Sequence, residues 1–89
     1  MIVEVYSKPN CKNCDTMADH FSAWLAENEG VADVKNRGAE DNIELLMDND
    51  VFAAPAYRII RGDEEEWVSG LNPDLLIDKL NGDDGVWGF

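Results

Sequence analysis

The chain has 89 residues and a formal net charge of -12, from 19 acidic and 7 basic residues, and 45% of its residues are hydrophobic. This length predicts one small folded domain, because it leaves room for a single core but not for two. The excess of acidic residues argues against nucleic acid and anionic membranes as partners, since each phosphate contact needs a cation. The charge can serve solubility or docking to a basic protein surface.

The first residues predict a strand rather than an export signal. Residues 2–6, IVEVY, are apolar and β-branched with Glu4 in the middle, which predicts a strand buried mainly on one face. We find no basic flank followed by a long apolar run, and no run of the roughly twenty apolar residues that a membrane span needs. We therefore expect a cytoplasmic protein. In such a reducing compartment a Cys-x-x-Cys pair more often has a redox or metal-binding role than a structural one.

A helix should follow the loop at residues 7–10 and run from about residue 11 to residue 28. Its apolar side chains recur at intervals of three and four residues, which gives one continuous stripe for a core. The stripe consists of Met17, Ala18, Phe21, Trp24 and Leu25. Gly30 ends the helix. His20 falls between the apolar positions, so we expect it on the polar face without a metal or catalytic role.

The middle of the chain predicts a weak strand, a turn and a short helix. The strand is VADV at residues 31–34, and the turn is at residues 36–38. Residues 40–48 predict the helix, because acidic residues occupy its first turn. Ile43, Leu46 and Met47 should lie on one side of it.

The last part of the chain predicts a hairpin and a closing helix. Residues 56–60 and 66–69 form the two strands, with a turn around Gly62. Residues 72–74, NPD, have the order of an N-cap, a proline at the first helical position and an acidic residue, so a helix should begin there and end at Gly82. The side chains that should point inward from this helix are Leu75, Leu76 and Leu80.

The predicted element order is βαβαββα. Two parallel strands joined by a crossover helix, then an antiparallel hairpin and a closing helix, give an α/β fold with a four-stranded mixed sheet flanked by helices. We assign residues 1–81 to this domain and residues 82–89 to an acidic and aromatic tail. Val86, Trp87 and Phe89 should let the tail fold back on the sheet or anchor a partner.

Cys11 and Cys14 lie at the predicted start of the first helix. A disulfide between them closes too short a loop to stabilise the fold much. A self-contained zinc site would need two more soft ligands, and the rest of the chain offers only His20, so we expect no bound metal. The helix N-terminus favours a thiolate at Cys11, and Lys8 and Lys12 should lower its pKa further. Cys14, one turn on, should be the more buried sulfur.

This asymmetry predicts a dithiol mechanism. The Cys11 thiolate attacks a substrate disulfide to form a mixed disulfide, and Cys14 then attacks the Cys11 sulfur and releases the reduced substrate. The alternative is a dimeric protein in which two chains share a zinc ion or an iron–sulfur cluster through four thiolates.

A second candidate feature is Ala54-Pro55, which places a proline at the start of a strand. A cis bond there would leave the backbone of Ala54 free to pair with an extended substrate segment. The alternative is an ordinary trans proline that marks a strand edge.

Three motifs in this order resemble the glutaredoxin-like proteins of the thioredoxin superfamily, and NrdH-redoxins most closely. They are YSKPNCKNC at residues 6–14, Ala54-Pro55, and WVSGLNPD at residues 67–74. The resemblance covers the chain to about Leu80 and implies a thioredoxin fold. It also implies a thiol–disulfide oxidoreductase whose only redox group is the Cys11–Cys14 pair.

The resemblance further implies site residues and partners. Pro55 would be a cis proline opposite the cysteines, with Ser69, Gly70 and Asp74 on the rim of the substrate groove. We expect Lys8, Pro9, Lys12 and Ala54 to contact the substrate as well. Electrons would pass from a thioredoxin-reductase-type flavoenzyme to a protein disulfide such as that of ribonucleotide reductase. We expect the protein to act as a monomer.

The chain departs from these families at several positions. Lys12-Asn13 between the cysteines matches neither group, and Leu71-Asn72 replaces the Phe-Arg of NrdH-redoxins. Ala-Ala-Pro and Ser-Gly stand where typical glutaredoxins have Thr-Val-Pro and Gly-Gly for glutathione, so glutathione use should be weak. Thioredoxins carry a buried acid beneath the resolving cysteine. The corresponding position here is Val5, with Glu4 on the opposite face.

Overall fold

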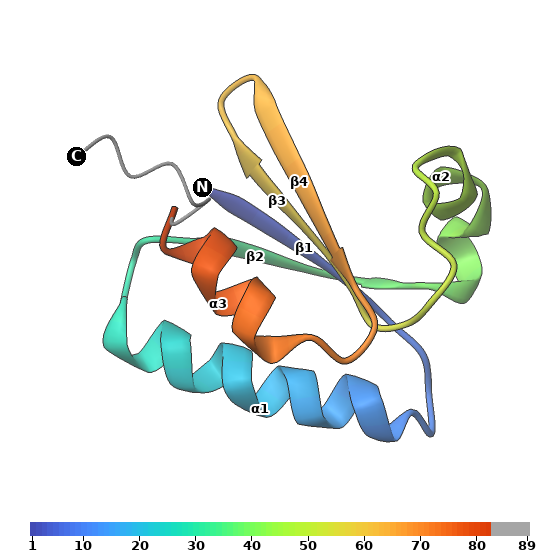
Figure 1. The fold of residues 1–89 in the computed structure, drawn as a ribbon, viewed down its shortest axis with the longest axis horizontal. Coiled ribbons are helices and arrows are strands. Elements are labelled where there is room, and N and C mark those ends of the chain that lie inside the picture. The colour runs from blue at the N-terminus through green and yellow to red at the C-terminus, as the bar shows by residue number, and fades with distance from the viewer. Residues whose placement is uncertain (83–89) are drawn as a thin grey trace.

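A computed structural model describes residues 1–82 of the chain (Figure 1). Its elements, in chain order, are β1 (Ile2–Ser7), α1 (Lys12–Glu27), β2 (Asp33–Gly38), the 3-10 helix η1 (Glu40–Asn42), α2 (Ile43–Asp48), β3 (Ala56–Arg61), β4 (Glu64–Ser69) and α3 (Pro73–Leu80). The predicted tail, with Val86, Trp87 and Phe89, lies beyond Gly82 and outside the described residues. Within residues 1–82, no helix is long and apolar enough to cross a membrane.

The strands form one mixed sheet in the order β2-β1-β3-β4. β1 pairs in parallel with β2 and antiparallel with β3, and β3 pairs antiparallel with β4. A parallel pair needs a crossover connection, which α1 supplies. This is the predicted α/β architecture, and it brings the end of β1, the start of α1 and the start of β3 together at one end of the sheet.

Helices α1 and α3 cover one face of the sheet (Figure 1). The core on this face contains Val3, Val5, Tyr57, Ile59 and Val68 from the strands and Met17, Phe21, Trp24, Leu76 and Leu80 from the helices. The predicted stripe of α1 is therefore largely confirmed, although Ala18 is exposed. Leu75 is also exposed, contrary to the prediction. Leu76 and Leu80, which are four residues apart, form the face of α3 that packs against the sheet, and Leu75 points away from that face.

Among residues 1–82, side chains of the chain cover the other face of the sheet at one end only. Helix α2 lies beside the end of β1 and the start of β3, away from α1 and α3 (Figure 1). A second cluster lies beneath it and contains Tyr6, Ala39, Leu46, Val51 and Ala56. Of the three apolar side chains predicted to share one side of this helix, only Leu46 is buried.

Charged side chains occupy the part of this face beyond α2. Residues 3–6 of β1 are all buried, Glu4 included, so the prediction of a strand buried mainly on one face was wrong. The carboxylate of Glu4 accepts hydrogen bonds from the Tyr6 hydroxyl at 2.9 Å, from Arg58 Nη1 at 3.1 Å and from Arg37 Nε at 3.2 Å. Arg58 also pairs with Glu65. We call Glu4, Tyr6, Arg37, Arg58 and Glu65 the Glu4 network; it lets a carboxylate be buried in an otherwise apolar strand.

The connection between β2 and α2 differs from the prediction. β2 spans Asp33–Gly38, so the predicted strand at residues 31–34 was placed too early and the predicted turn at residues 36–38 is part of the strand. Pairing with β1 sets these bounds, from Ile2 opposite Asp33 to Ser7 opposite Gly38. Most side chains of this edge strand are exposed, so apolar content could not locate it. The predicted helix at residues 40–48 is the turn η1 followed by α2.

Candidate active site

Cys11 and Cys14 lie at the first turn of α1 and form a disulfide, with their Cα atoms 5.2 Å apart. Cys11 is the N-cap of the helix, and its Sγ accepts a hydrogen bond from the Cys14 N–H at 3.1 Å. Cys14 is only 6% exposed, whereas Cys11 is partly exposed. The predicted difference in burial is therefore present: one sulfur faces solvent at a helix N-terminus, and the other lies behind it.

A cavity of about 380 Å³ opens at Cys11. Four predicted site residues line it, namely Lys8, Pro9, Lys12 and Ala54. Asn10 and Asn13 line it too, and the sequence analysis passed over both as site residues. Asn10 has φ +55°, a left-handed conformation that asparagine adopts more readily than most residues. This asparagine directly before the cysteine was the available signal for a sharp turn from β1 into the helix.

The Ala54–Pro55 bond is cis, as the resemblance implied. The Pro55 carbonyl accepts a hydrogen bond from the Gly70 N–H at 2.8 Å, and Ser69 pairs with Ala56 in the sheet. Ser69 and Gly70 therefore lie next to Pro55, but they do not line the cavity at Cys11, and neither does the exposed Asp74. Their part in a substrate groove stays a prediction.

Ala54 presents free backbone groups beside the cavity. Within residues 1–82, neither its N–H nor its carbonyl makes a backbone hydrogen bond. Unpaired backbone groups at a strand start can receive an extended peptide. The observation agrees with the role predicted for this residue.

The inner side of Cys14 is apolar. Val5 is buried on the face that α1 covers, and Met17, one turn after Cys14, is fully buried. The Met17 sulfur accepts a hydrogen bond from the Asn72 N–H at 3.4 Å, which ties the segment after β4 to α1. Among the described residues Glu4 is the one buried charged side chain, and it lies on the opposite face of the sheet. Glu4 therefore points to the face opposite Val5, as predicted.

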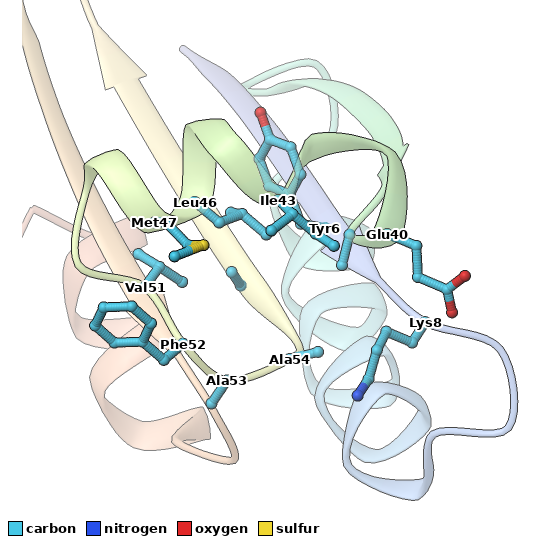
Figure 2. A pocket seen from close by; sticks show the side chains of 12 residues that line it. Tyr6, Lys8, Glu40, Ile43, Leu46, Met47, Val51, Phe52, Ala53 and Ala54 are labelled. Atoms are coloured by element: carbon cyan, nitrogen blue, oxygen red, sulfur yellow. The ribbon is translucent and has the colours of Figure 1, made fainter.

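A second pocket of about 280 Å³, here called the apolar pocket, adjoins the first (Figure 2). Lys8 and Ala54 line both. Its other walls come from α2, with Ile43 and Met47, and from the segment before Pro55, with Val51 and Phe52, over a floor that includes Tyr6. The sequence analysis missed this pocket because three separate stretches of the chain, residues 6–8, 39–47 and 51–56, contribute its walls.

The described residues offer no obvious metal site. Within residues 1–82, no three His, Cys, Asp or Glu side chains lie together in a way that could hold a metal ion. His20 is exposed on α1, as predicted.

Comparison with solved structures gives close matches to the whole described fold. The germline-specific thioredoxin Deadhead of Drosophila melanogaster superposes with a TM-score of 0.74 at 17% identity, covering 91% of this chain and 78% of that one. The chain has a thioredoxin fold. Thioredoxin from Fasciola hepatica gives a TM-score of 0.71 at 24% identity, covering 93% and 80% of the two chains.

A further solved thioredoxin structure also superposes on this fold. Oxidized mitochondrial thioredoxin 3 from Saccharomyces cerevisiae gives a TM-score of 0.74 at 15% identity and covers 91% of this chain and 76% of that one. No protein-family model and no curated protein sequence matches the chain. Identities this low show the thioredoxin fold and leave the activity to be argued from the site.

Proposed function

We propose that this chain is a dithiol–disulfide oxidoreductase that reduces disulfides of other proteins. One observation carries the proposal: in a thioredoxin fold, a partly exposed Cys11 caps α1 and is bonded to a buried Cys14, beside the free backbone of Ala54. The Cys14 N–H that now meets the Cys11 sulfur would equally stabilise a Cys11 thiolate in the reduced protein.

The reaction transfers two electrons from the reduced pair to the substrate. The Cys11 thiolate attacks one sulfur of the substrate disulfide; that S–S bond breaks, and the departing sulfur takes a proton from water. Cys14 then loses its proton and attacks the Cys11 sulfur, which releases the second substrate thiol and restores the Cys11–Cys14 disulfide. Among the described residues the one buried carboxylate, Glu4, lies on the opposite face of the sheet, so we propose that water removes this proton.

An external thiol or flavoenzyme must reduce the pair again. We propose a thioredoxin-reductase-type flavoenzyme as the reductant and ribonucleotide reductase as one acceptor, both from the resemblance of the three motifs to NrdH-redoxins. Glutathione should work poorly. It is anionic, the chain carries a charge of -12, and Ala53-Ala54-Pro55 lacks the polar side chain that typical glutaredoxins have there. We also propose that the protein acts in the cytoplasm, a reducing compartment in which a Cys-x-x-Cys pair more often has a redox role than a structural one.

Insulin reduction tests the proposal. The assay is run with thioredoxin reductase and NADPH, with glutathione and glutathione reductase, and with dithiothreitol as a reductant that needs no recognition. Turnover should be clear with the first and third systems and weak with the second. Absence of any acceleration over dithiothreitol alone would refute the proposal.

Two cysteine variants assign the roles. Cys11→Ser should lose all turnover, because it removes the attacking sulfur. Cys14→Ser should accumulate a mixed disulfide between Cys11 and the substrate, visible by mass spectrometry, because nothing resolves it. Ser22→Ala, an exposed change on the same helix, is the matched control and should keep full turnover. Turnover by Cys11→Ser would refute the assignment.

A further inference from the structure

Two lysines at the candidate active site stand apart from the other basic residues. Five of the seven basic side chains form ion pairs, namely Lys35, Arg37, Arg58, Arg61 and Lys79. Lys8 and Lys12 form none with any residue from 1 to 82, and both line the cavity at Cys11. No acidic side chain of the described chain lines that cavity. Glu40 lines the adjoining apolar pocket together with Lys8, but the two form no ion pair, so this chain of charge -12 keeps two lysines, unpaired within residues 1–82, at the cavity of Cys11.

The apolar pocket continues from this cavity and is open. Phe52 is 75% exposed, Met47 55% and Ile43 54%, and all three line the same pocket. Clustered large apolar side chains on a small acidic domain are typical of a surface that a partner covers. Figure 2 shows Ala54 between Phe52 and Lys8, so one extended segment lying over Ala54 can reach both the apolar pocket and the lysines.

We propose that the chain selects protein disulfides by two features of the sequence around the attacked cysteine. An acidic residue next to that cysteine binds Lys8 and Lys12, and a large apolar side chain about three residues away fills the apolar pocket. Three extended residues span roughly 10 Å, a reach suited to adjoining cavities. This selection rests on the oxidoreductase function proposed above and adds a substrate class to it.

A set of four peptides tests the selection. The parent peptide is Phe-Ser-Glu-Cys-Glu-Ser-Phe, and two copies are joined by a disulfide between their cysteines. In the second peptide Gln replaces both Glu residues, and in the third Ser replaces both Phe residues. The fourth peptide carries both sets of replacements. Reduction is followed at about 0.15 M salt, where a screening length of about 8 Å removes the effect of distant carboxylates. Glu should raise kcat/KM about three- to tenfold over Gln, and Phe about tenfold or more over Ser.

Variants separate substrate binding from effects on the thiolate. Lys8→Met and Lys12→Met keep the side-chain stem and remove the charge. If the lysines bind the substrate, these variants lose the preference for Glu over Gln. If they act only on the Cys11 thiolate, all four peptides slow equally, and the proposal is overturned. Lys35→Met, at a lysine of β2 that lines neither cavity, is the matched control and should keep both the rate and the preference.

The apolar pocket has its own variant. Met47→Gln keeps the side-chain length and should lose most of the preference for Phe over Ser, whereas Val31→Thr, an exposed apolar residue elsewhere, should not. Equal rates for all peptides alongside normal insulin reduction would overturn the selection and leave the oxidoreductase function standing. A change of oligomeric state in Met47→Gln without a change of preference would assign the pocket to self-association and also overturn it. No turnover with any disulfide would overturn both proposals.

Discussion

Replacement of Glu4 by Gln tests whether the Glu4 network stabilises the fold without taking part in catalysis. Burial raises the pKa of Glu4, but hydrogen bonds from Tyr6 and Arg58 and the charges of Arg58 and Arg37 outweigh it, so the pKa lies below its usual 4.5. Gln has nearly the same shape and can still accept a hydrogen bond from the Tyr6 hydroxyl. It removes the charge that faces the two arginines.

The size of the effect follows from the exposure of the partners. Removal of one partner from a fully buried ion pair costs about 3–5 kcal/mol, and exposed pairs contribute about 0–1 kcal/mol. The Glu4 side chain is 11% exposed, against 23% for Arg58 and 47% for Arg37, so the pairs lie between these limits. We expect Glu4→Gln to lower the free energy of unfolding by about 1–3 kcal/mol. For a domain of this size that is a fall in Tm of about 5–20 °C.

The pH dependence identifies the charge as the cause. A carboxylate with a lowered pKa contributes stability that is complete above its unfolded pKa and lost as the pH falls through the folded one. The difference between wild type and Glu4→Gln should therefore be full at about pH 7 and smaller at about pH 3. Urea unfolding followed by circular dichroism measures it at both values.

Two further measurements complete this test. Glu29→Gln removes the same charge from an exposed turn, forms no ion pair within residues 1–82, and should change stability by less than about 0.5 kcal/mol. The rate at which Cys11 reacts with an alkylating reagent should be unchanged in Glu4→Gln, because Glu4 lies across the sheet from Cys14. A difference in stability that is the same at both pH values, or a slower Cys11, would contradict this account.

Three other predictions concern the groove, the core and metal. Gly70→Ala and Gly30→Ala place a side chain at φ +76° and +77°, so each should lower the free energy of unfolding by about 1–2 kcal/mol. Only Gly70→Ala should slow insulin reduction, because only Gly70 forms a hydrogen bond with Pro55. Equal insulin reduction by the two variants would refute this. Burial raises the pKa of Tyr57 to about 12. The wild type should therefore lose stability relative to Tyr57→Phe as the pH rises from about 10 to about 12. A free energy of unfolding that changes equally with pH in both proteins would contradict this. Dialysis against a chelator should leave insulin reduction unchanged, and activity restored only by added metal would favour the shared-metal alternative.

Local signals in the sequence predicted most of the fold and the centre of the site. The stripe of α1, the proline at the start of α3 and the glycine at the β3–β4 turn each act within a few residues, so they can be read without the structure. The same is true of Cys11 and Cys14, whose difference in burial follows from their order at a helix start. The lysines around Cys11 lie close to it in the chain, and the cavity confirms that placement.

Features that depend on distant residues were missed. The bounds of β2 follow from its register with β1, and its exposed side chains give no apolar pattern. Glu4 was expected on an open face because a lone carboxylate does not reveal that Arg37 and Arg58, more than thirty residues away, will meet it. The apolar pocket likewise needs α2 to be placed against the end of β1, which no local pattern specifies.

Tyr6 connects the two features that the sequence did not reveal. Its ring lies on the floor of the apolar pocket and packs against Trp67, with the ring centres 5.6 Å apart, and its hydroxyl donates to Glu4. The ion pairs on this face therefore hold a residue that lines the pocket, while the core on the other face holds α1, whose first turn carries Cys14. If the two proposals hold, substitutions in the pocket should change which disulfides are reduced, and substitutions around α1 should change how fast any disulfide is reduced.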